Sequence, residues 1–167
     1  MCGIVGGVTN TNITTLLMDG LKRLEYRGYD SSGLVVLSKN NELLRERAAG
    51  RVENLENKLK SIKSKLKGNI GLAHTRWATH GKPSVNNAHP HISKNSISVV
   101  HNGIIENYIE LKNHQIKNGY SFNSDTDTEV IAHAVDFAMK SCDTLLSSVQ
   151  LAIQSFTGSF GIGIIST

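Results

Sequence analysis

The sequence predicts a single α+β domain built mainly on antiparallel sheet. Apolar segments of strand length come in neighbouring pairs, and amphipathic helical segments arrive in blocks instead of alternating with single strands. There is no internal repeat or low-complexity segment. A chain of 167 residues is also long enough to bury a substantial core.

Apolar and turn-forming residues divide the first 75 residues into strands and helices. In chain order we expect a strand at 4–8, a helix at 14–26 with Leu16, Leu17, Leu21 and Leu24 on one stripe, strands at 33–38 and 42–48 in a hairpin, a helix through 55–66 and a strand at 69–75. The lysines of the second helix belong to its outer face, so the net charge of +4 needs no nucleic-acid partner. The chain also lacks an RNP-type aromatic string, a zinc-finger spacing and a phosphate-binding loop.

The second half of the chain begins with an irregular stretch at 76–96. The elements expected after it are a strand at 96–103 that ends at Asn-Gly, helices at 106–117 and 128–140, a helix from Asp143 or Thr144 to about 156, and a strand at 158–167. No apolar run is long enough to span a bilayer, and we expect no membrane association. Two cysteines, Cys2 and Cys142, predict a reducing, cytoplasmic compartment and no disulfide framework.

The opening segment, MCGIVGG, places a cysteine at the second position. Removal of Met1, which is common before a small side chain, would leave Cys2 with a thiol and a free α-amine on one residue. That pair is a nucleophile beside its own base. The alternative is a buried structural cysteine at the start of an apolar strand.

Two further segments carry candidate site residues directly after or at the end of strands. In HTRWATHG, residues 74–81, Arg76 suits bidentate recognition of a carboxylate, and neighbouring hydroxyls can supplement it. In HNG, residues 101–103, the Asn102 side-chain amide and the Gly103 N–H can both donate to a developing oxyanion. The alternative for this segment is a tight turn, because Asn-Gly is the commonest turn dipeptide.

The segment SDTDTE, residues 124–129, has two possible uses. Thr126 and Glu129 have the spacing of a capping box at the start of a helix. Asp127 is the carboxylate that best suits a ligand amine. The two uses are compatible, since they involve different side chains.

Several histidines raise the hypothesis of a zinc site: His74, His80, His89 and His91. Metal sites in proteins combine such residues at recognisable spacings. No HExxH, CxxC or third-ligand spacing accompanies these histidines. We therefore expect no metal and no other cofactor.

A terminal thiol, oxyanion donors, an arginine and an aspartate together suit a substrate with both amino-acid groups and a scissile acyl bond. Six segments carry a resemblance to a known family in this order and spacing: MCGIVG, RLEYRGYDSSG, HTRWATHG, NAHPH, VVHNGIIENY and SDTDTEVIAH. They resemble the glutaminase domain of the glutamine–fructose-6-phosphate aminotransferases, which are also called glucosamine-6-phosphate synthases and belong to the class II glutamine amidotransferases. The resemblance runs along residues 1–167 and includes GSFGIGIIST.

The resemblance implies an N-terminal-nucleophile hydrolase fold, with two stacked, mainly antiparallel sheets between helical layers. It implies that Cys2 attacks the side-chain amide of L-glutamine, releases ammonia and forms a γ-glutamyl thioester, which water hydrolyses. Asn102 and Gly103 would stabilise the oxyanion. The residues implied to bind the amino-acid groups of glutamine are Arg76, Thr79, His80 and Asp127. Those implied in supporting roles are Arg27, Trp77 and His89.

The full enzymes of this family carry two sugar-isomerase domains after the glutaminase domain, and these are the partners that the resemblance implies. Residues 1–167 contain no segment for them. GIGIIST ends in mid-strand, so we expect the final strands of the domain to be missing. Two alternatives stay open: the glutaminase domain of another class II amidotransferase, and a catalytically silent fragment.

Overall fold

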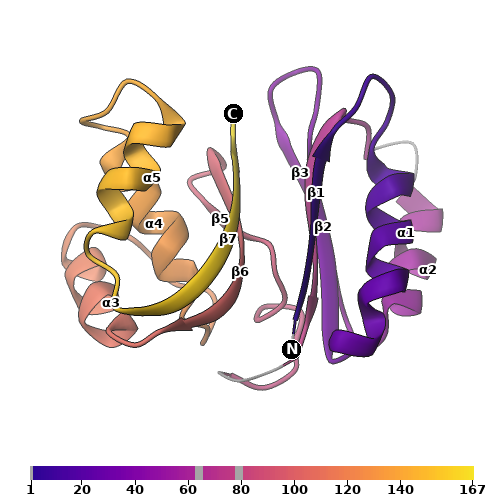
Figure 1. Ribbon diagram of the computed structural model, residues 1–167, viewed down its shortest axis with the longest axis horizontal. Helices are drawn as coiled ribbons and strands as arrows, with labels where there is room; N and C mark the ends of the chain where they lie inside the picture. The colour runs from indigo at the N-terminus through magenta and orange to yellow at the C-terminus, as the bar shows by residue number, and fades with distance from the viewer. Residues whose placement is uncertain (1, 63–65, 78–80) are drawn as a thin grey trace.

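The computed structural model describes residues 2–62, 66–77 and 81–167 (Figure 1). Two sheets lie face to face, and helices cover the outer face of each sheet. The layers therefore follow the order helix, sheet, sheet, helix. This arrangement confirms the predicted α+β class with two stacked antiparallel sheets.

Four strands form the first sheet in the spatial order β1-β4-β2-β3, and every neighbouring pair is antiparallel. Their bounds are β1 Gly3–Val8, β2 Ser31–Leu37, β3 Leu43–Ala49 and β4 Ile70–Arg76. Thr75 of β4 lies opposite Gly3 of β1, and Arg76 lies opposite Ser31 of β2. The starts of β1 and β2 and the end of β4 therefore meet at one end of the sheet.

Two helices, α1 Thr14–Leu24 and α2 Val52–Ile62, cover the outer face of the first sheet (Figure 1). A 3-10 turn, Glu25–Arg27, follows α1 where the sequence predicted a continuous helix to residue 26. Leu17 and Leu21 are fully buried as predicted, but Leu16 is 50% exposed. Leu16 lies about 100° around the helix from Leu17, outside the stripe that faces the sheet.

The lysine-rich face of α2 points outward and makes ion pairs within the fold. Lys58 lies 2.8 Å from Glu46 of β3, and Lys22 of α1 lies 2.8 Å from Glu56. Leu55, on the opposite side of α2, is fully buried in the core between the helices and the sheet. The structure thus confirms the amphipathic helix inferred from the sequence, but α2 itself is balanced in charge, because Glu53 and Glu56 offset Lys58 and Lys60.

Three strands form the second sheet in the order β5-β6-β7: β5 His91–Ser93, β6 Ile97–Ile105 and β7 Gly158–Ser166. The helices on its outer face are α3 Tyr108–Lys117, α4 Glu129–Ala138 and α5 Leu145–Ile153 (Figure 1). Side chains of β6 and α4 form most of the buried apolar core between this sheet and its helices. Thr144 caps α5 with a capping box, which confirms one of the two predicted caps.

Three expectations for the second half are wrong. The stretch at 76–96 contains β5, a strand too short to show a periodic pattern. The strand with Asn102 and Gly103 continues to Ile105, because β7 pairs with it beyond the Asn-Gly pair. The capping box of Thr126 and Glu129 does not form: α4 begins at Glu129, whose carboxylate instead accepts hydrogen bonds from the preceding loop.

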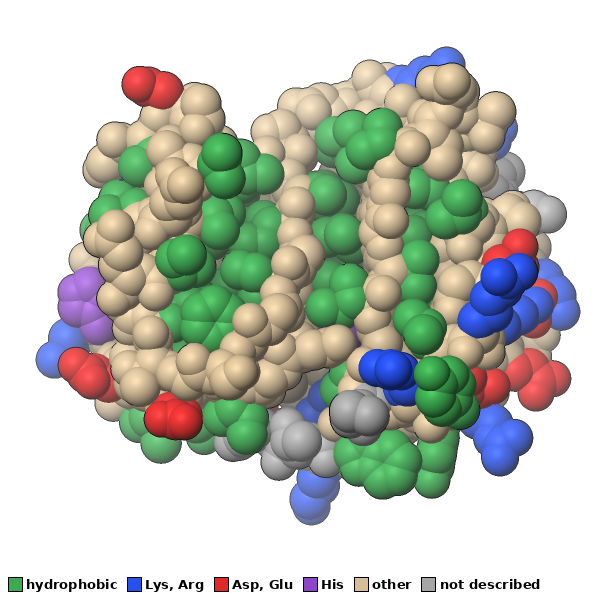
Figure 2. Space-filling model, viewed as in Figure 1, with side chains coloured by type: hydrophobic (Ala, Val, Ile, Leu, Met, Phe, Trp, Pro, Cys, Tyr) green, Lys and Arg blue, Asp and Glu red, His purple; other side chains and the backbone are tan. Residues whose placement is uncertain are grey.

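Apolar side chains fill the space between the two sheets. Val35 and Leu72 from the first sheet pack with Val100 and Ile165 from the second. Figure 2 shows hydrophobic side chains between the sheets, with many of the visible charged side chains on the outer helical surfaces. Within the described ranges, no helix has both the length and the apolar character needed to cross a bilayer.

Candidate active site

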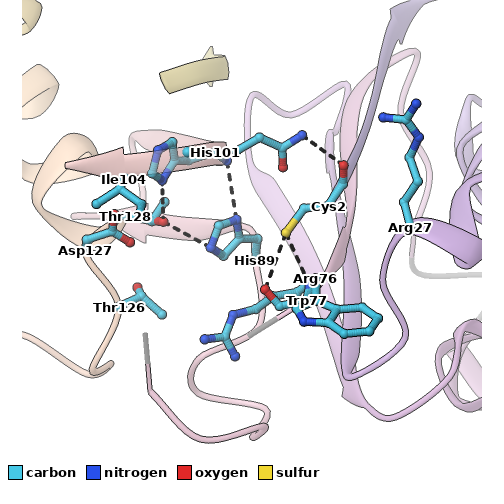
Figure 3. Close-up of a pocket in the computed structure, with 12 residues that line it drawn as sticks. Cys2, Arg27, Arg76, Trp77, His89, His101, Ile104, Thr126, Asp127 and Thr128 are labelled. Atoms are coloured by element: carbon cyan, nitrogen blue, oxygen red, sulfur yellow. Dashed lines mark hydrogen bonds between the residues drawn. The ribbon is translucent and has the colours of Figure 1, made fainter. Parts of the chain in front are cut away.

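A cavity of about 370 Å³ lies between the two sheets, where β1 starts and β4 ends and where residues 101–104 of β6 face them (Figure 3). All of the predicted site residues that the structure describes line this cavity: Cys2, Arg27, Arg76, Trp77, His89, Asn102, Gly103 and Asp127. Thr79 and His80, also predicted, lie outside the described residues, as does Met1. The fold thus gathers one cavity wall from segments that are up to 125 residues apart.

Cys2 is held at the cavity by residues at the end of β4 and directly after it. Its Sγ accepts a hydrogen bond from the backbone N–H of Trp77 at 3.2 Å (Figure 3). The next residue, Gly3, donates its N–H to Thr75 Oγ1 at 3.2 Å. A Cβ at Gly3 would lie 2.9 Å from that hydroxyl, so the close approach of β1 to Thr75 requires glycine. The thiol in turn lies 3.6 Å from the Trp77 carbonyl oxygen, to which it can donate.

Asn102 lies beside Cys2 in the interior of β6. Its Nδ2 donates to the Cys2 carbonyl oxygen at 3.2 Å, and its Oδ1 lies 2.9 Å from His74 Nε2. Gly103 follows with a φ of 127°, and a Cβ there would lie 2.1 Å from the Ser159 carbonyl oxygen. The sequence motif therefore serves the close pairing of β6 with β7 instead of a turn.

Arg76 and Asp127 place opposite charges in the same cavity. The Arg76 side chain is nearly buried: its Nη2 donates to the Gly81 carbonyl oxygen at 3.3 Å, and its Nη1 lies 3.8 Å from Asp30 Oδ1. Asp127 is 5% exposed, and its Oδ2 accepts a hydrogen bond from the Ile105 N–H at 2.9 Å. Figure 3 shows Asp127 on the side of the cavity away from Cys2. A guanidinium and a carboxylate placed this way suit a zwitterionic amino acid.

Two further predicted residues, Trp77 and Arg27, lie at the cavity rim. Trp77 is 48% exposed, and its ring packs edge-on against Tyr29 with a centroid distance of 5.3 Å. Arg27, in the 3-10 turn after α1, donates from Nε to the Tyr26 hydroxyl at 3.1 Å. Figure 3 shows Arg27 on the Cys2 side of the site.

Buried histidines form the floor between the sheets. His74 and His89 stack with their ring centroids 4.2 Å apart, and His91 packs edge-on to His89 at 5.0 Å. His101 donates its backbone N–H to His89 Nδ1 at 3.3 Å. Burial lowers the pKa of His74 to about 4, and it holds the pKa values of His89 and His91 well below their usual range. These three rings are therefore neutral at pH 7.

The histidines are engaged with protein groups. Thr128 Oγ1 lies 3.1 Å from His89 Nε2 and 2.9 Å from His101 Nδ1, and Thr126 Oγ1 lies 3.1 Å from His91 Nε2. In the part of the chain that the structure describes, no group of three or more histidine, cysteine or acidic side chains could hold a metal ion.

Sequence reasoning missed Thr128 altogether and considered His101 only as part of the HNG motif. A histidine directly after the apolar run SVV signals a buried polar side chain, so His101 could have been found. Thr128 has no comparable signal, because its contacts depend on how the start of α4 packs over β5 and β6.

Two stacked antiparallel sheets between helical layers are the architecture of the hydrolases with an N-terminal nucleophile. The family model for the glutamine amidotransferase domain matches residues 74–167, more than half of the chain. The chain therefore belongs to the glutamine amidotransferase domain family.

Curated relatives make the assignment more specific. The chain is 52% identical over 163 residues to glutamine–fructose-6-phosphate aminotransferase [isomerizing] from Buchnera aphidicola, and 53% identical over 167 residues to the enzyme of the same name from Acinetobacter baylyi. These alignments cover 97% and 100% of this chain but 26% and 27% of the relatives. The chain thus spans about a quarter of their length, and the resemblance inferred from the motifs is confirmed.

Solved structures confirm the predicted N-terminal-nucleophile fold. A structure of glutamine phosphoribosylpyrophosphate amidotransferase from B. subtilis with ADP and GMP superposes with a TM-score of 0.78 at 24% identity, over 99% of this chain and 34% of that one. A structure described as the allosteric regulatory enzyme of purine biosynthesis gives a TM-score of 0.81 at 26% identity, over 98% of this chain and 35% of that one.

Proposed function

We propose that this chain is the glutaminase unit of a glucosamine-6-phosphate synthase and hydrolyses L-glutamine to glutamate and ammonia. One observation carries the proposal. A single cavity holds the Cys2 thiol, the Asn102 carboxamide, the buried Arg76 guanidinium and the buried Asp127 carboxylate. These groups match the scissile amide, its developing oxyanion, the α-carboxylate and the α-amine of glutamine.

The substrate is held by its α-groups and presents its side-chain amide to sulfur. Arg76, with Thr79 and His80, binds the α-carboxylate, and Asp127 binds the α-amine. Glutamate would place an unreactive, charged carboxylate at Cys2. Asparagine is one methylene shorter, so its amide carbon would not reach the sulfur when the α-groups are anchored. Misplacements of this size lower the reaction rate strongly.

The chemistry needs Met1 to be removed, since the Cys2 α-amine is the base. The amine takes the thiol proton, and sulfur adds to the amide carbon to give an oxyanion bound by Asn102 Nδ2 and the Gly103 N–H. The ammonium returns its proton to the leaving nitrogen, the C–N bond breaks, and ammonia departs from a γ-glutamyl thioester. Water then adds to the thioester and gives a proton to the amine. The C–S bond breaks, and protonation of sulfur restores the thiol beside glutamate.

In the whole protein, the ammonia would serve the amination of fructose 6-phosphate. The chain is 52–53% identical to curated glutamine–fructose-6-phosphate aminotransferases and 24% identical to the phosphoribosylpyrophosphate amidotransferase. These identities favour fructose 6-phosphate over phosphoribosylpyrophosphate as the acceptor of the ammonia. Residues 1–167 would then act as the glutaminase domain beside sugar-isomerase domains. The free thiols of Cys2 and Cys142 support a reducing, cytoplasmic compartment.

Labelling with 6-diazo-5-oxo-L-norleucine, a glutamine analogue that alkylates the nucleophile, tests the proposed function. The intact mass of the chain freed of Met1 should rise by one adduct, which peptide mapping places on Cys2 and which excess glutamine prevents. A Cys142→Ser variant is the matched control and should be labelled like the wild type. A folded, Met1-free chain that takes up no adduct, or takes it up only at Cys142, would overturn the proposal.

A further inference from the structure

We propose that His74 is a positioning residue for the oxyanion site: it fixes the side-chain orientation of Asn102 so that the amide N–H₂ faces Cys2. The inference rests on the proposed glutaminase function, in which Asn102 donates to the oxyanion. It concerns a residue that touches no substrate group in that proposal. The Asn102 carboxamide has a hydrogen-bond partner on either side, and these two partners set its orientation.

The first step is the protonation state of the His74 ring. Nε2 lies 3.1 Å from the His101 carbonyl oxygen and 2.9 Å from Asn102 Oδ1. A carbonyl oxygen can only accept, so Nε2 carries the hydrogen and donates. Nδ1 is then the unprotonated nitrogen of a neutral ring. The pKa of about 4 that burial gives His74 keeps this form in place at neutral pH.

The second step is the orientation of the Asn102 carboxamide. With Nε2–H of His74 on one side, the group that faces it must be the acceptor Oδ1. On the other side, the Cys2 carbonyl oxygen accepts from Nδ2 at 3.2 Å. The N–H₂ group has a second hydrogen, which is available to an oxygen bound beside the Cys2 sulfur. A carboxamide rotated by 180° would instead set two oxygens against each other and present an acceptor to the oxyanion.

The Asn102 carboxamide needs a second hydrogen bond besides the one to Cys2 to keep its orientation during the reaction. The carboxamide is oriented by two hydrogen bonds, one to His74 and one to the Cys2 carbonyl oxygen. Without His74, the bond to Cys2 would be the one left of these two, and Cys2 is the residue that reacts. His74 comes from β4, in the other sheet, and does not take part in the bond changes. It therefore holds the donor in place while the geometry at Cys2 changes.

The surroundings of His74 argue against a purely packing role. The side chain is fully buried, and among the described residues Nδ1 has no hydrogen-bond partner. Burying an unpartnered polar nitrogen is unfavourable, and an apolar ring would stack on His89 without that penalty. The Nε2 side is the part of the ring that makes the hydrogen bonds, to Asn102 and to the His101 carbonyl oxygen.

The test compares His74→Phe, which keeps a ring on His89 but has no donor, with His74→Gln, which keeps an N–H at a similar reach. Glutamine hydrolysis is measured in the full-length protein, in a Cys142→Ser background. We expect His74→Phe to lower kcat roughly 10- to 100-fold, up to the loss typical of removing one oxyanion donor, with little change in KM. His74→Gln should recover most of kcat. Alkylation of Cys2 by iodoacetamide, which forms no oxyanion, should proceed at the wild-type rate in both variants.

A double-mutant cycle separates positioning from general destabilisation. When Asn102→Ala has removed the carboxamide, adding His74→Phe should change kcat less than about threefold, because no donor is left to orient. Additive losses would overturn the inference, and so would a wild-type kcat in His74→Phe. If circular dichroism shows that His74→Phe does not fold, His74→Leu replaces it in the same cycle. A wild-type protein that neither hydrolyses glutamine nor reacts with the diazo analogue would instead refute the proposed function.

Discussion

At the scale of single residues, the cavity depends on charged side chains that are nearly removed from water. Asp127 shows this most directly, because its carboxylate is 5% exposed and accepts the Ile105 N–H. Asp127→Asn keeps an oxygen for that N–H but loses the charge. We expect KM for glutamine to rise about 30-fold, equivalent to ~2 kcal/mol for one charge-assisted hydrogen bond, with a smaller change in kcat. Steady-state glutaminase kinetics measure both.

The matched control for Asp127→Asn is Asp125→Asn, two residues away. Asp125 accepts a hydrogen bond from Asn87 Nδ2 at 3.2 Å and does not line the cavity. Its substitution should leave KM within about twofold, as is usual for changes away from a site. An equal rise in KM for both variants would show that the loop is sensitive to substitution as such, and would contradict a charge-specific role for Asp127.

Protonation of the buried histidines sets a second expectation at this scale. His74 has a folded pKa of about 4 against 6.5 when exposed, so the unfolded chain binds more protons between these values. The free energy of unfolding is therefore highest above pH 6.5 and falls as the pH drops towards 4, by roughly 3 kcal/mol for His74 alone. His89 and His91 act in the same direction.

Urea unfolding between pH 7.5 and pH 4.5 measures this dependence. In His74→Gln the fall should be shallower than in the wild type, because one titrating group is gone. A wild-type stability that does not decline below pH 6.5 would contradict the buried, neutral state of these rings.

At the scale of elements, local patterns predicted most helices and strands, and long-range pairing decided the rest. α2 and β4 follow from apolar spacing that any short window contains. β5 does not, because its three residues are a strand only through pairing with β6. The candidate site divides in the same way. Cys2 and Asn102 could be proposed as site residues from short sequence motifs, whereas the contact of His74 with Asn102 joins two sheets and has no local signal.

Pairing of β6 with β7 makes Gly103 a sensitive position. Gly103→Ala would place a methyl group 2.1 Å from the Ser159 carbonyl oxygen. The backbone φ of 127° at this position is also one that residues with a side chain rarely adopt. We expect a loss of roughly 3 kcal/mol or more in the free energy of unfolding, measured with urea. Gly161→Ala, on the partner strand β7, is the control: a Cβ there meets nothing within 4 Å, so its effect should stay below about 1 kcal/mol.

At the scale of the whole molecule, the site is divided between the two sheets. Cys2 and Arg76 belong to the first sheet and its end, whereas Asn102 lies on a strand of the second and Asp127 just before its covering helix. The apolar contact between the sheets therefore sets the distances across the cavity. Loosening that contact should affect catalysis as well as stability.

Leu72→Ala tests this coupling, since Leu72 belongs to the core between the sheets. We expect a loss of roughly 2–5 kcal/mol in stability and about a tenfold lower kcat for the folded protein. Leu59→Ala is the control, because Leu59 is equally buried beneath the outer helices, away from the cavity. It should be destabilised to a similar degree while the folded fraction keeps its kcat. Equal kcat in the two variants would contradict the coupling.

The order of strands in the first sheet also has a consequence for synthesis. Among the strands that the structure describes, β1 pairs with β4 alone, so Gly3 meets Thr75 only after the ribosome has made β4. At about 5–20 residues per second, the leading segment stays without its partner for on the order of 3–15 s. An aminopeptidase thus has several seconds to reach the start of the nascent chain before β1 docks. Cys2 is among the first residues to be made, yet its contacts with Trp77 and Asn102 must wait until those residues exist.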